Sequence, residues 1–202
     1  MAVRKPTIPE TFKKLVAFLE SQHVPFVVVG GLAVGLQGEP RATRDVDFMI
    51  RLASSKVVEF ARAAKLDGFD VEPELAETQW LASGFLRLGL GPPGKQVDID
   101  LMACNSEFLE EATWRAQQAR FCGLVVPVAA AEDLMLFKLS AWREKDIPDI
   151  RSVFLRHGER LDVAYLKQWA GWFAAKNPHF KDVPERLEAI LENRPGPPAK
   201  PG

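Results

Sequence analysis

Two pairs of aspartates in short apolar segments constrain what this 202-residue chain can fold into. Asp45 and Asp47 begin one apolar segment, and Asp98 and Asp100 lie in another further along the chain. Because side chains i and i+2 of a strand point to the same side, each pair should place two carboxylates on one face of a sheet. Neighbouring carboxylates resist joint ionisation unless a cation shares them. The pairs therefore predict strands that carry a divalent-metal site.

Apolar periodicity and turn residues predict a series of helices and strands along the chain. Thr7 and Glu10 form a capping-box pattern ahead of an amphipathic helix that Pro25 ends. Helices are expected over residues 8–22, 32–37, from Ser54 or Ser55 onward, 106–117, 130–142 and 146–193, and strands over 26–29, 45–50, 69–71, 85–90 and 96–103. Residues 119–128 are expected to form a hairpin.

The order of these elements indicates an α/β or α+β domain followed by helices. Residues 1–130 are expected to form the core. Residues 131–194 should form a helical segment packed on it, because no linker rich in glycine or serine separates the two. Residues 195–202 contain four prolines and two glycines, which predicts a disordered tail.

Composition gives no bulk signal for nucleic acid or for a membrane. The net charge is -1 and the pI is about 6.3, so any polyanionic partner must meet a local patch. No run of the chain approaches the roughly 20 apolar residues that span a bilayer, and its start has no apolar signal core. The cysteines Cys104 and Cys122 have no metal-ligand spacing. A reduced cytoplasmic protein is expected.

The spacing of the aspartates also suggests what the metal would do. Mg²⁺ or Mn²⁺ prefers oxygen ligands, and it commonly takes one or two carboxylates while waters and phosphates fill the other positions. Two such ions sharing an aspartate can activate an attacking oxygen and stabilise a leaving pyrophosphate. The paired glycines Gly30 and Gly31 precede the first aspartates. Their backbone N–H groups, at a helix N-terminus, could hold a triphosphate.

The motifs of this chain resemble a known family. The resembling segments are Gly30-Gly31, residues 41–48, residues 97–101, residues 132–139 and residues 143–150. Together they look like the minimal nucleotidyltransferases of the polymerase-beta-like superfamily. The nearest subgroup has a Gly-Gly turn, and contains the AbiEii-type toxins and related uncharacterised proteins. The resemblance implies the nucleotidyltransferase fold, an α+β (α/β-like) architecture with a mixed β-sheet flanked by helices and a C-terminal helical segment.

The resemblance also implies roles for individual residues in the first half of the chain. Gly30 and Gly31 would contact phosphates, although serine is usual at the second position and its hydroxyl contact is lost here. Asp45 and Asp47 would bind metal. Asp98 is the expected third carboxylate, and Asp100, on the same face, is the alternative.

Further roles are implied for residues after position 130. Lys138 would neutralise the triphosphate and so act in catalysis together with the aspartates. Asp146 or Asp149 would orient the nucleotide or bind the lysine, because a spacing of three places both on one helix face. Lys138 could instead extend to solvent, and Asp146 could simply cap its helix.

Other polar and aromatic side chains leave alternatives open. Arg41 and Arg44 flank the first aspartates, and would contact phosphate or form salt bridges with neighbouring acids. Trp142, Trp169 and Trp172 lie at positions that favour core packing over stacking on a nucleobase.

The expected activity is the metal-dependent transfer of a nucleoside monophosphate from an NTP to an acceptor hydroxyl. The resemblance implies a tRNA 3′ end or a protein as acceptor, in a toxin–antitoxin or defence setting with an antitoxin as partner. One alternative is the modification of a small, aminoglycoside-like molecule, with Asp146, Asp149 and the surplus aspartate of the second pair forming an acidic pocket. Another is a non-catalytic nucleotide-binding module of the same fold.

Overall fold

The computed structural model describes residues 4–192, so the tail expected at 195–202 lies outside the described residues. Within the described part, the chain forms two compact units. The first unit comprises residues 4–33 and 41–129, and the second comprises residues 34–40 and 130–192. None of the described helices is long and apolar enough to cross a membrane.

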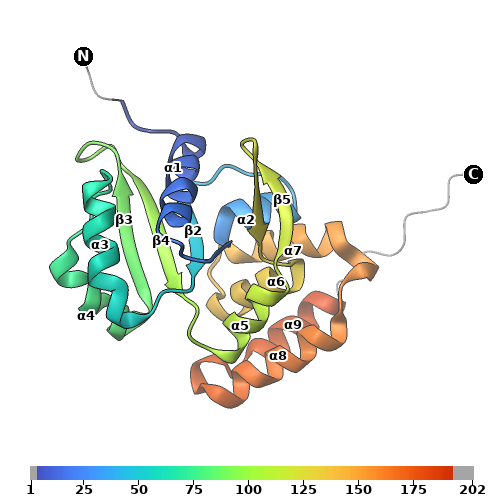
Figure 1. Cartoon of the computed structure of the whole chain (residues 1–202). Coiled ribbons are helices and arrows are strands. Elements are labelled where there is room, and N and C mark those ends of the chain that lie inside the picture. Colours follow the sequence, from blue (N-terminus) through green and yellow to red (C-terminus); the bar gives the residue numbers. More distant parts are fainter. Residues whose placement is uncertain (1–3, 193–202) are drawn as a thin grey trace, which may run out of the picture. The chain divides into compact units, whose positions relative to one another are not determined.

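One mixed sheet forms the centre of the first unit (Figure 1). Its strands, in spatial order, are β3 (Phe85–Leu90), β4 (Val97–Ala103), β2 (Asp45–Ile50), β1 (Phe26–Val28), β6 (Leu124–Val128) and β5 (Gln117–Phe121). β2 runs parallel to β4, and β1 runs parallel to β6. The other neighbouring pairs are antiparallel. This mixed sheet with flanking helices confirms the α+β architecture expected from the sequence.

The helices divide between the two units. The first unit contains α1 (Ile8–Ser21), α3 (Val57–Leu66), α4 (Pro73–Ser83) and α5 (Glu107–Trp114). The second unit contains α6 (Ala131–Ala141), α7 (Asp146–His157), α8 (Val163–Lys176) and α9 (Val183–Glu192). α2 (Gly30–Gln37) begins in the first unit, and its last residues belong to the second.

α1 shows how local sequence signals and burial act together. The Thr7 side chain accepts a hydrogen bond from the backbone of Glu10, and the Glu10 carboxylate accepts one from the backbone of Thr7. This capping box satisfies N–H groups that the helix itself cannot pair. The apolar side of α1 is buried, and its Phe12 ring lies 5.5 Å from the Phe48 ring of β2. Burial of each such ring stabilises the fold by about 2 kcal/mol.

The two faces of the β2–β4 pair differ sharply in character. Val46, Phe48, Ile99 and Leu101 alternate with the aspartates and are completely buried. The aspartates therefore lie on the opposite face, where their side chains are exposed or partly exposed. Strand alternation alone thus separates the hydrophobic core from the predicted site.

Two local expectations are wrong. Residues 69–71 do not form a strand, because only a single bridge joins Asp70 to Gly89. The following segment forms α4, which the sequence analysis did not predict. Pro73 suits the first turn of this helix, and Gly84 ends it in the left-handed conformation with φ 69°. The helix expected to reach residue 117 ends at Trp114, and β5 begins soon afterwards.

The second unit is helical, as expected. Aromatic rings of α8 pack edge to face, with ring centroids 5.2 Å apart for Trp169 and Trp172 and 5.5 Å apart for Trp172 and Phe173. Of the three tryptophans expected in the core, Trp169 is buried, whereas Trp142 and Trp172 are partly exposed. Trp142 ends α6 with φ 47°, and the Arg186 guanidinium lies over its ring at 5.0 Å.

Candidate functional site

Strand register brings both aspartate pairs together in the first unit. Asp45 is the Cα partner of Asp98, and Asp47 is the partner of Asp100. Because neighbouring strands lie about 4.8 Å apart and paired residues of parallel strands share a face, all four carboxylates project from one surface. Asp98 is exposed and the other three are partly exposed. The parallel pairing of β2 with β4 therefore creates a compact acidic surface.

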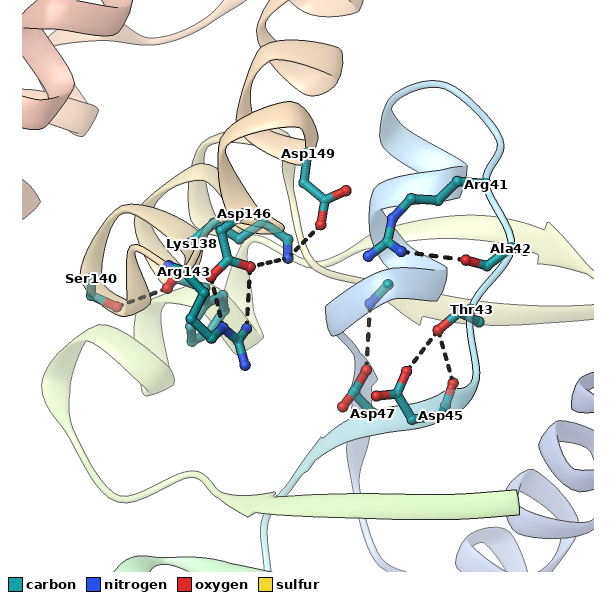
Figure 2. A network of polar contacts seen from close by, with 12 residues as sticks. Arg41, Ala42, Thr43, Asp45, Asp47, Lys138, Ser140, Arg143, Asp146 and Asp149 are labelled. Carbon is teal, nitrogen blue, oxygen red and sulfur yellow. Dashed lines mark hydrogen bonds and ion pairs between the residues drawn. The ribbon is translucent and has the colours of Figure 1, made fainter. Parts of the chain in front are cut away.

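The glycine turn is fitted around Asp47. Gly30 has a φ of 62°, a conformation that residues with a side chain rarely adopt. A Cβ atom at Gly30 would overlap the Asp47 carboxylate, so this position excludes side chains for a second reason. The Gly31 N–H group donates a hydrogen bond of 3.4 Å to Asp47 Oδ2 (Figure 2). The glycine turn thus packs against Asp47 and also hydrogen-bonds to it.

Thr43 holds the first aspartate, a role that the sequence analysis missed. Its hydroxyl donates a hydrogen bond of 2.7 Å to Asp45 Oδ1, and Figure 2 shows the two side chains directed at each other. A threonine two residues before an aspartate is the available sequence signal, because Thr hydroxyls commonly bond groups two positions away. That pattern is frequent in loops, so it carries little weight without the structure.

Arg87 on β3 distinguishes the aspartates of the second pair. Its guanidinium forms a bidentate ion pair with Asp100, with Nε–Oδ1 and Nη2–Oδ2 distances of 2.7 and 2.9 Å. The hydrogen bonds and charge of Asp100 raise the pKa of Arg87 above its usual value, and Asp98 and Asp45 add smaller attractions. The Asp98 side chain has no hydrogen-bond or ion-pair partner among residues 4–192. Asp98 is therefore the more accessible carboxylate of the second pair.

The carboxylates suit a hard divalent cation. Asp45, Asp47 and Asp98 offer oxygen donors on one face, and Mg²⁺ completes its octahedral coordination with waters and phosphate oxygens. Among the described residues, no three acidic, histidine or cysteine side chains are gathered closely enough to hold a metal ion. Bringing the three carboxylates onto one cation therefore requires rotation of their side chains.

The two arginines ahead of β2 differ in their surroundings. Arg41 donates a hydrogen bond of 3.3 Å from Nη1 to the carbonyl oxygen of Ala42 (Figure 2). Its Nη2 atom lies 3.2 Å from the position that a Cβ atom of Gly31 would occupy. The Arg44 side chain is exposed and forms no hydrogen bond or ion pair with another described residue. Arg44 is therefore available to an anionic ligand.

In the second unit, Lys138 lies in a buried network with both acids of α7. Its Nζ atom lies 2.8 Å from Asp146 Oδ1 and 2.7 Å from Asp149 Oδ2 (Figure 2). Lys138 is 6% exposed, so it does not extend to solvent. The spacing of three on α7 thus directs both carboxylates at one ammonium group.

Arg143 completes this network and was not singled out from the sequence. Its backbone N–H and its guanidinium donate hydrogen bonds to Asp146, with distances of 3.0 Å from N and 2.8 Å from Nε to Oδ2. Burial alone would raise the pKa of Asp146, but the hydrogen bonds from Arg143 and Lys138 together lower it to about 2. Asp146 therefore remains ionised and joins Arg143, in the connection between α6 and α7, to the lysine of α6.

Solved structures with a similar fold include two antibiotic-modifying enzymes. The crystal structure of the lincosamide antibiotic adenylyltransferase LnuA with lincomycin matches with a TM-score of 0.53 and 16% identity, covering 74% of this chain and 98% of that one. The structure of ANT(2″)-Ia in complex with adenylyl-2″-tobramycin matches with a TM-score of 0.55 and 18% identity, covering 80% of this chain and 95% of that one. At these identities the likeness establishes the fold.

Sequence comparison identifies the family directly. No curated protein matches the chain significantly. The profile of the family described as "Nucleotidyltransferase of unknown function (DUF6036)" matches residues 8–182, which is most of the chain. The match confirms the nucleotidyltransferase superfamily and the enzyme class expected from the sequence. The chain belongs to the DUF6036 family of nucleotidyltransferases.

Proposed function

We propose that this protein transfers a nucleoside monophosphate from an NTP to an acceptor hydroxyl with the help of Mg²⁺ or Mn²⁺. The observation that carries the proposal is the in-register pairing of Asp45 with Asp98 and of Asp47 with Asp100, next to a glycine turn fitted around Asp47. A turn that is built around a carboxylate and opens a helix provides N–H donors for phosphates beside ligands for a cation.

The proposed reaction assigns a task to each group of the first unit. The N–H groups at the start of α2 bind the triphosphate, while Asp45, Asp47 and Asp98 hold the cation. Bound Mg²⁺ would offset the charge of the phosphate oxygens and favour ionisation of the acceptor hydroxyl. The acceptor oxygen bonds to the α-phosphorus, the bond from that phosphorus to pyrophosphate breaks, and Asp98 or solvent takes the acceptor proton. Arg44 adds positive charge for the phosphates.

The direct binding of triphosphate by Lys138 stays a prediction. Its ammonium is already balanced by Asp146 and Asp149, which supports a role in fixing α6 against α7. In this proposal Asp149 and Asp146 orient Lys138. They affect nucleotide binding only indirectly, by fixing the position of that lysine.

The acceptor first proposed is a tRNA 3′ end or a protein hydroxyl. This choice follows the resemblance to AbiEii-type toxins, and it includes a toxin–antitoxin or defence role in the cytoplasm with an antitoxin as partner. The acidic surface around the aspartates gives no general attraction for RNA, so a tRNA acceptor would require local contacts such as Arg44.

A small-molecule acceptor is the second candidate, and a cavity beside Asp98 favours it. This cavity of about 270 Å³ is bordered by the side chains of Asp70, Glu72, Arg87 and Gln96. Glu72 pairs with Lys65 and Asp70 accepts a hydrogen bond from Gln96, but the Asp98 carboxylate, which also lines the cavity, pairs with no described cation. It suits an amine-bearing acceptor better than Asp146 and Asp149 of the second unit, which are engaged with Lys138. The intact set of carboxylates argues against a purely non-catalytic module.

Calorimetric titration with Mg²⁺ and each NTP tests the nucleotide site. We expect metal-dependent binding that Asp45→Ala and Asp47→Ala abolish. Glu77→Ala serves as the control, because Glu77 is an exposed acid of α4. Unchanged binding in both aspartate variants would reject the metal site.

Labelled NTPs incubated with bulk tRNA, cell extract or amine-bearing antibiotics distinguish the acceptors. Labelling of tRNA or protein would support the first candidate, and labelling of a small molecule would support the second. Intact nucleotide binding without any labelled product would favour the non-catalytic module.

A further inference from the structure

Gly31 lies close to Asp47 and to Thr43, the residue that bonds Asp45. Its N–H group donates to Asp47 Oδ2 at 3.4 Å. The space that its side chain would fill is taken by the loop ahead of β2, because a Cβ atom on Gly31 would lie 2.7 Å from Thr43 Oγ1. That separation is far below an ordinary carbon–oxygen contact. The missing side chain at position 31 is therefore what allows the Thr43 hydroxyl to lie beside the turn.

The same hydroxyl determines which oxygen of Asp45 is available. Thr43 has one hydroxyl proton, and its shorter contact, of 2.7 Å, is with Asp45 Oδ1; the carbonyl oxygen of Asp45 lies at 3.3 Å. A hydrogen bond to a carboxylate is short and fixes the orientation of that group. With Oδ1 engaged, Asp45 keeps Oδ2 for another ligand.

We propose that Thr43 is a positioning residue, which orients Asp45 for a divalent cation and depends on the absence of a side chain at Gly31. This inference rests on the proposed metal-dependent function, which it deepens by naming the group that orders the first ligand. Gly31 and Thr43 then act as a pair, since a side chain added at one position must displace the other.

Mn²⁺ binding, followed by electron paramagnetic resonance on the protein without nucleotide, tests the positioning role. We expect Thr43→Val, which keeps the shape but removes the hydroxyl, to weaken Mn²⁺ binding about tenfold, the loss of one hydrogen bond to a charged group. Thr43→Ser should restore it. Thr78→Val, in the exposed surface of α4, is the matched control and should bind like the wild-type protein.

Urea unfolding without metal tests whether a side chain at position 31 and the Thr43 hydroxyl compete for the same space. Gly31→Ala should destabilise the wild-type protein more than it destabilises the Thr43→Ala variant, because the oxygen at 2.7 Å is then gone and only contacts of 3.2 Å with Arg41 Nη2 and the Cβ atom at position 43 remain. Equal effects of Gly31→Ala in the two backgrounds would overturn the pairing.

The outcomes separate this inference from the proposed function. Mn²⁺ binding that is equal in Thr43→Val and wild-type protein, or absent from the wild-type protein, would overturn the role of Thr43. Mn²⁺ binding that depends on the Thr43 hydroxyl, in a protein that transfers no nucleotide to any acceptor, would support the role of Thr43 while rejecting the proposed transferase reaction.

Discussion

Asp45 and Asp98 are Cα partners in the parallel pairing of β2 with β4, whereas Asp100, two residues further along β4, forms a bidentate ion pair with Arg87. The register places both members of the second pair near the first, and the arginine then distinguishes between them. The structure thus gives a physical reason to prefer Asp98 over Asp100 as the third carboxylate of the proposed site.

This assignment predicts unequal effects of two matched substitutions. Asp98→Asn should lower the rate of pyrophosphate release at least about 10²-fold, the scale for losing a charged group of a reaction site. Asp100→Asn should have a much smaller effect, because Asp100 already neutralises Arg87. The measurement is pyrophosphate release at saturating NTP and Mg²⁺. A severe defect in Asp100→Asn with normal rates in Asp98→Asn would reverse the assignment.

The close approach of Asp47 to Gly30 predicts that a methyl group at position 30 strongly lowers the free energy of unfolding. Gly30→Ala must adopt a positive φ and must also displace the Asp47 carboxylate. Gly94→Ala is the control, because Gly94 has a φ of 75° but open space around it. We expect Gly30→Ala to reduce the free energy of unfolding by about 2 kcal/mol more than the control does, as measured by urea unfolding. Equal losses would show that only the backbone conformation matters.

The buried network of the second unit predicts that Lys138 is needed for stability. Lys138→Met would leave Asp146 and Asp149 buried without their shared cation, at a cost of about 3 kcal/mol in unfolding free energy. Lys167→Met is the control, because the ion pair of Lys167 with Glu188, at 2.9 Å, is about half exposed and contributes less than about 1 kcal/mol. A fully stable Lys138→Met variant that fails to bind triphosphate would instead favour the direct nucleotide role.

The low pKa of Asp146 predicts a specific dependence of stability on acid. Its folded-state pKa of about 2 lies below the ordinary value of 3.8, so the ionised form stabilises the folded state. This contribution, about 2 kcal/mol, is fully present above about pH 5 and is lost as the pH falls from about 4 to 2. Asp146→Asn should remove it, so the stability difference from wild type should shrink over that interval.

Urea unfolding at a series of pH values measures this difference. Asp182→Asn is a suitable control, since Asp182 is about half exposed and lies 3.8 Å from Arg186. A difference between wild type and Asp146→Asn that stays constant down to pH 2 would contradict the predicted protonation.

Most of the sheet could be predicted from the sequence because strand alternation is a local property. The strand expected at 45–50 has those bounds in the structure, and the faces of Asp45 and Asp47 follow from it. α4 escaped prediction because its buried residues, Pro73, Ala76 and Trp80, give only a narrow apolar stripe. A short apolar run at 69–71 looked like a strand, but its neighbour β3 contributes only one bridge to it.

The local partners of the site residues could not be predicted in the same way. The choice between Asp98 and Asp100 depends on Arg87, which becomes a neighbour only through the antiparallel register of β3 and β4. The Thr43 hydroxyl lies where a side chain of residue 31 would be, and its position depends on the path of the loop ahead of β2. A loop has no periodic pattern of apolar residues from which its path could be predicted. Likewise, the burial of Lys138 follows from the packing of α6 against α7, whereas the sequence shows only a lysine in an apolar helix.

The alternation of aspartates with core residues on β2 and β4 has a consequence for folding. A slip of one residue in either strand would carry its aspartates into the hydrophobic layer and turn residues such as Val46 or Ile99 toward water. Buried, unpaired carboxylates are so costly that such a misaligned sheet could not persist. The residues that we assign to chemistry therefore also ensure that these strands align in only one way.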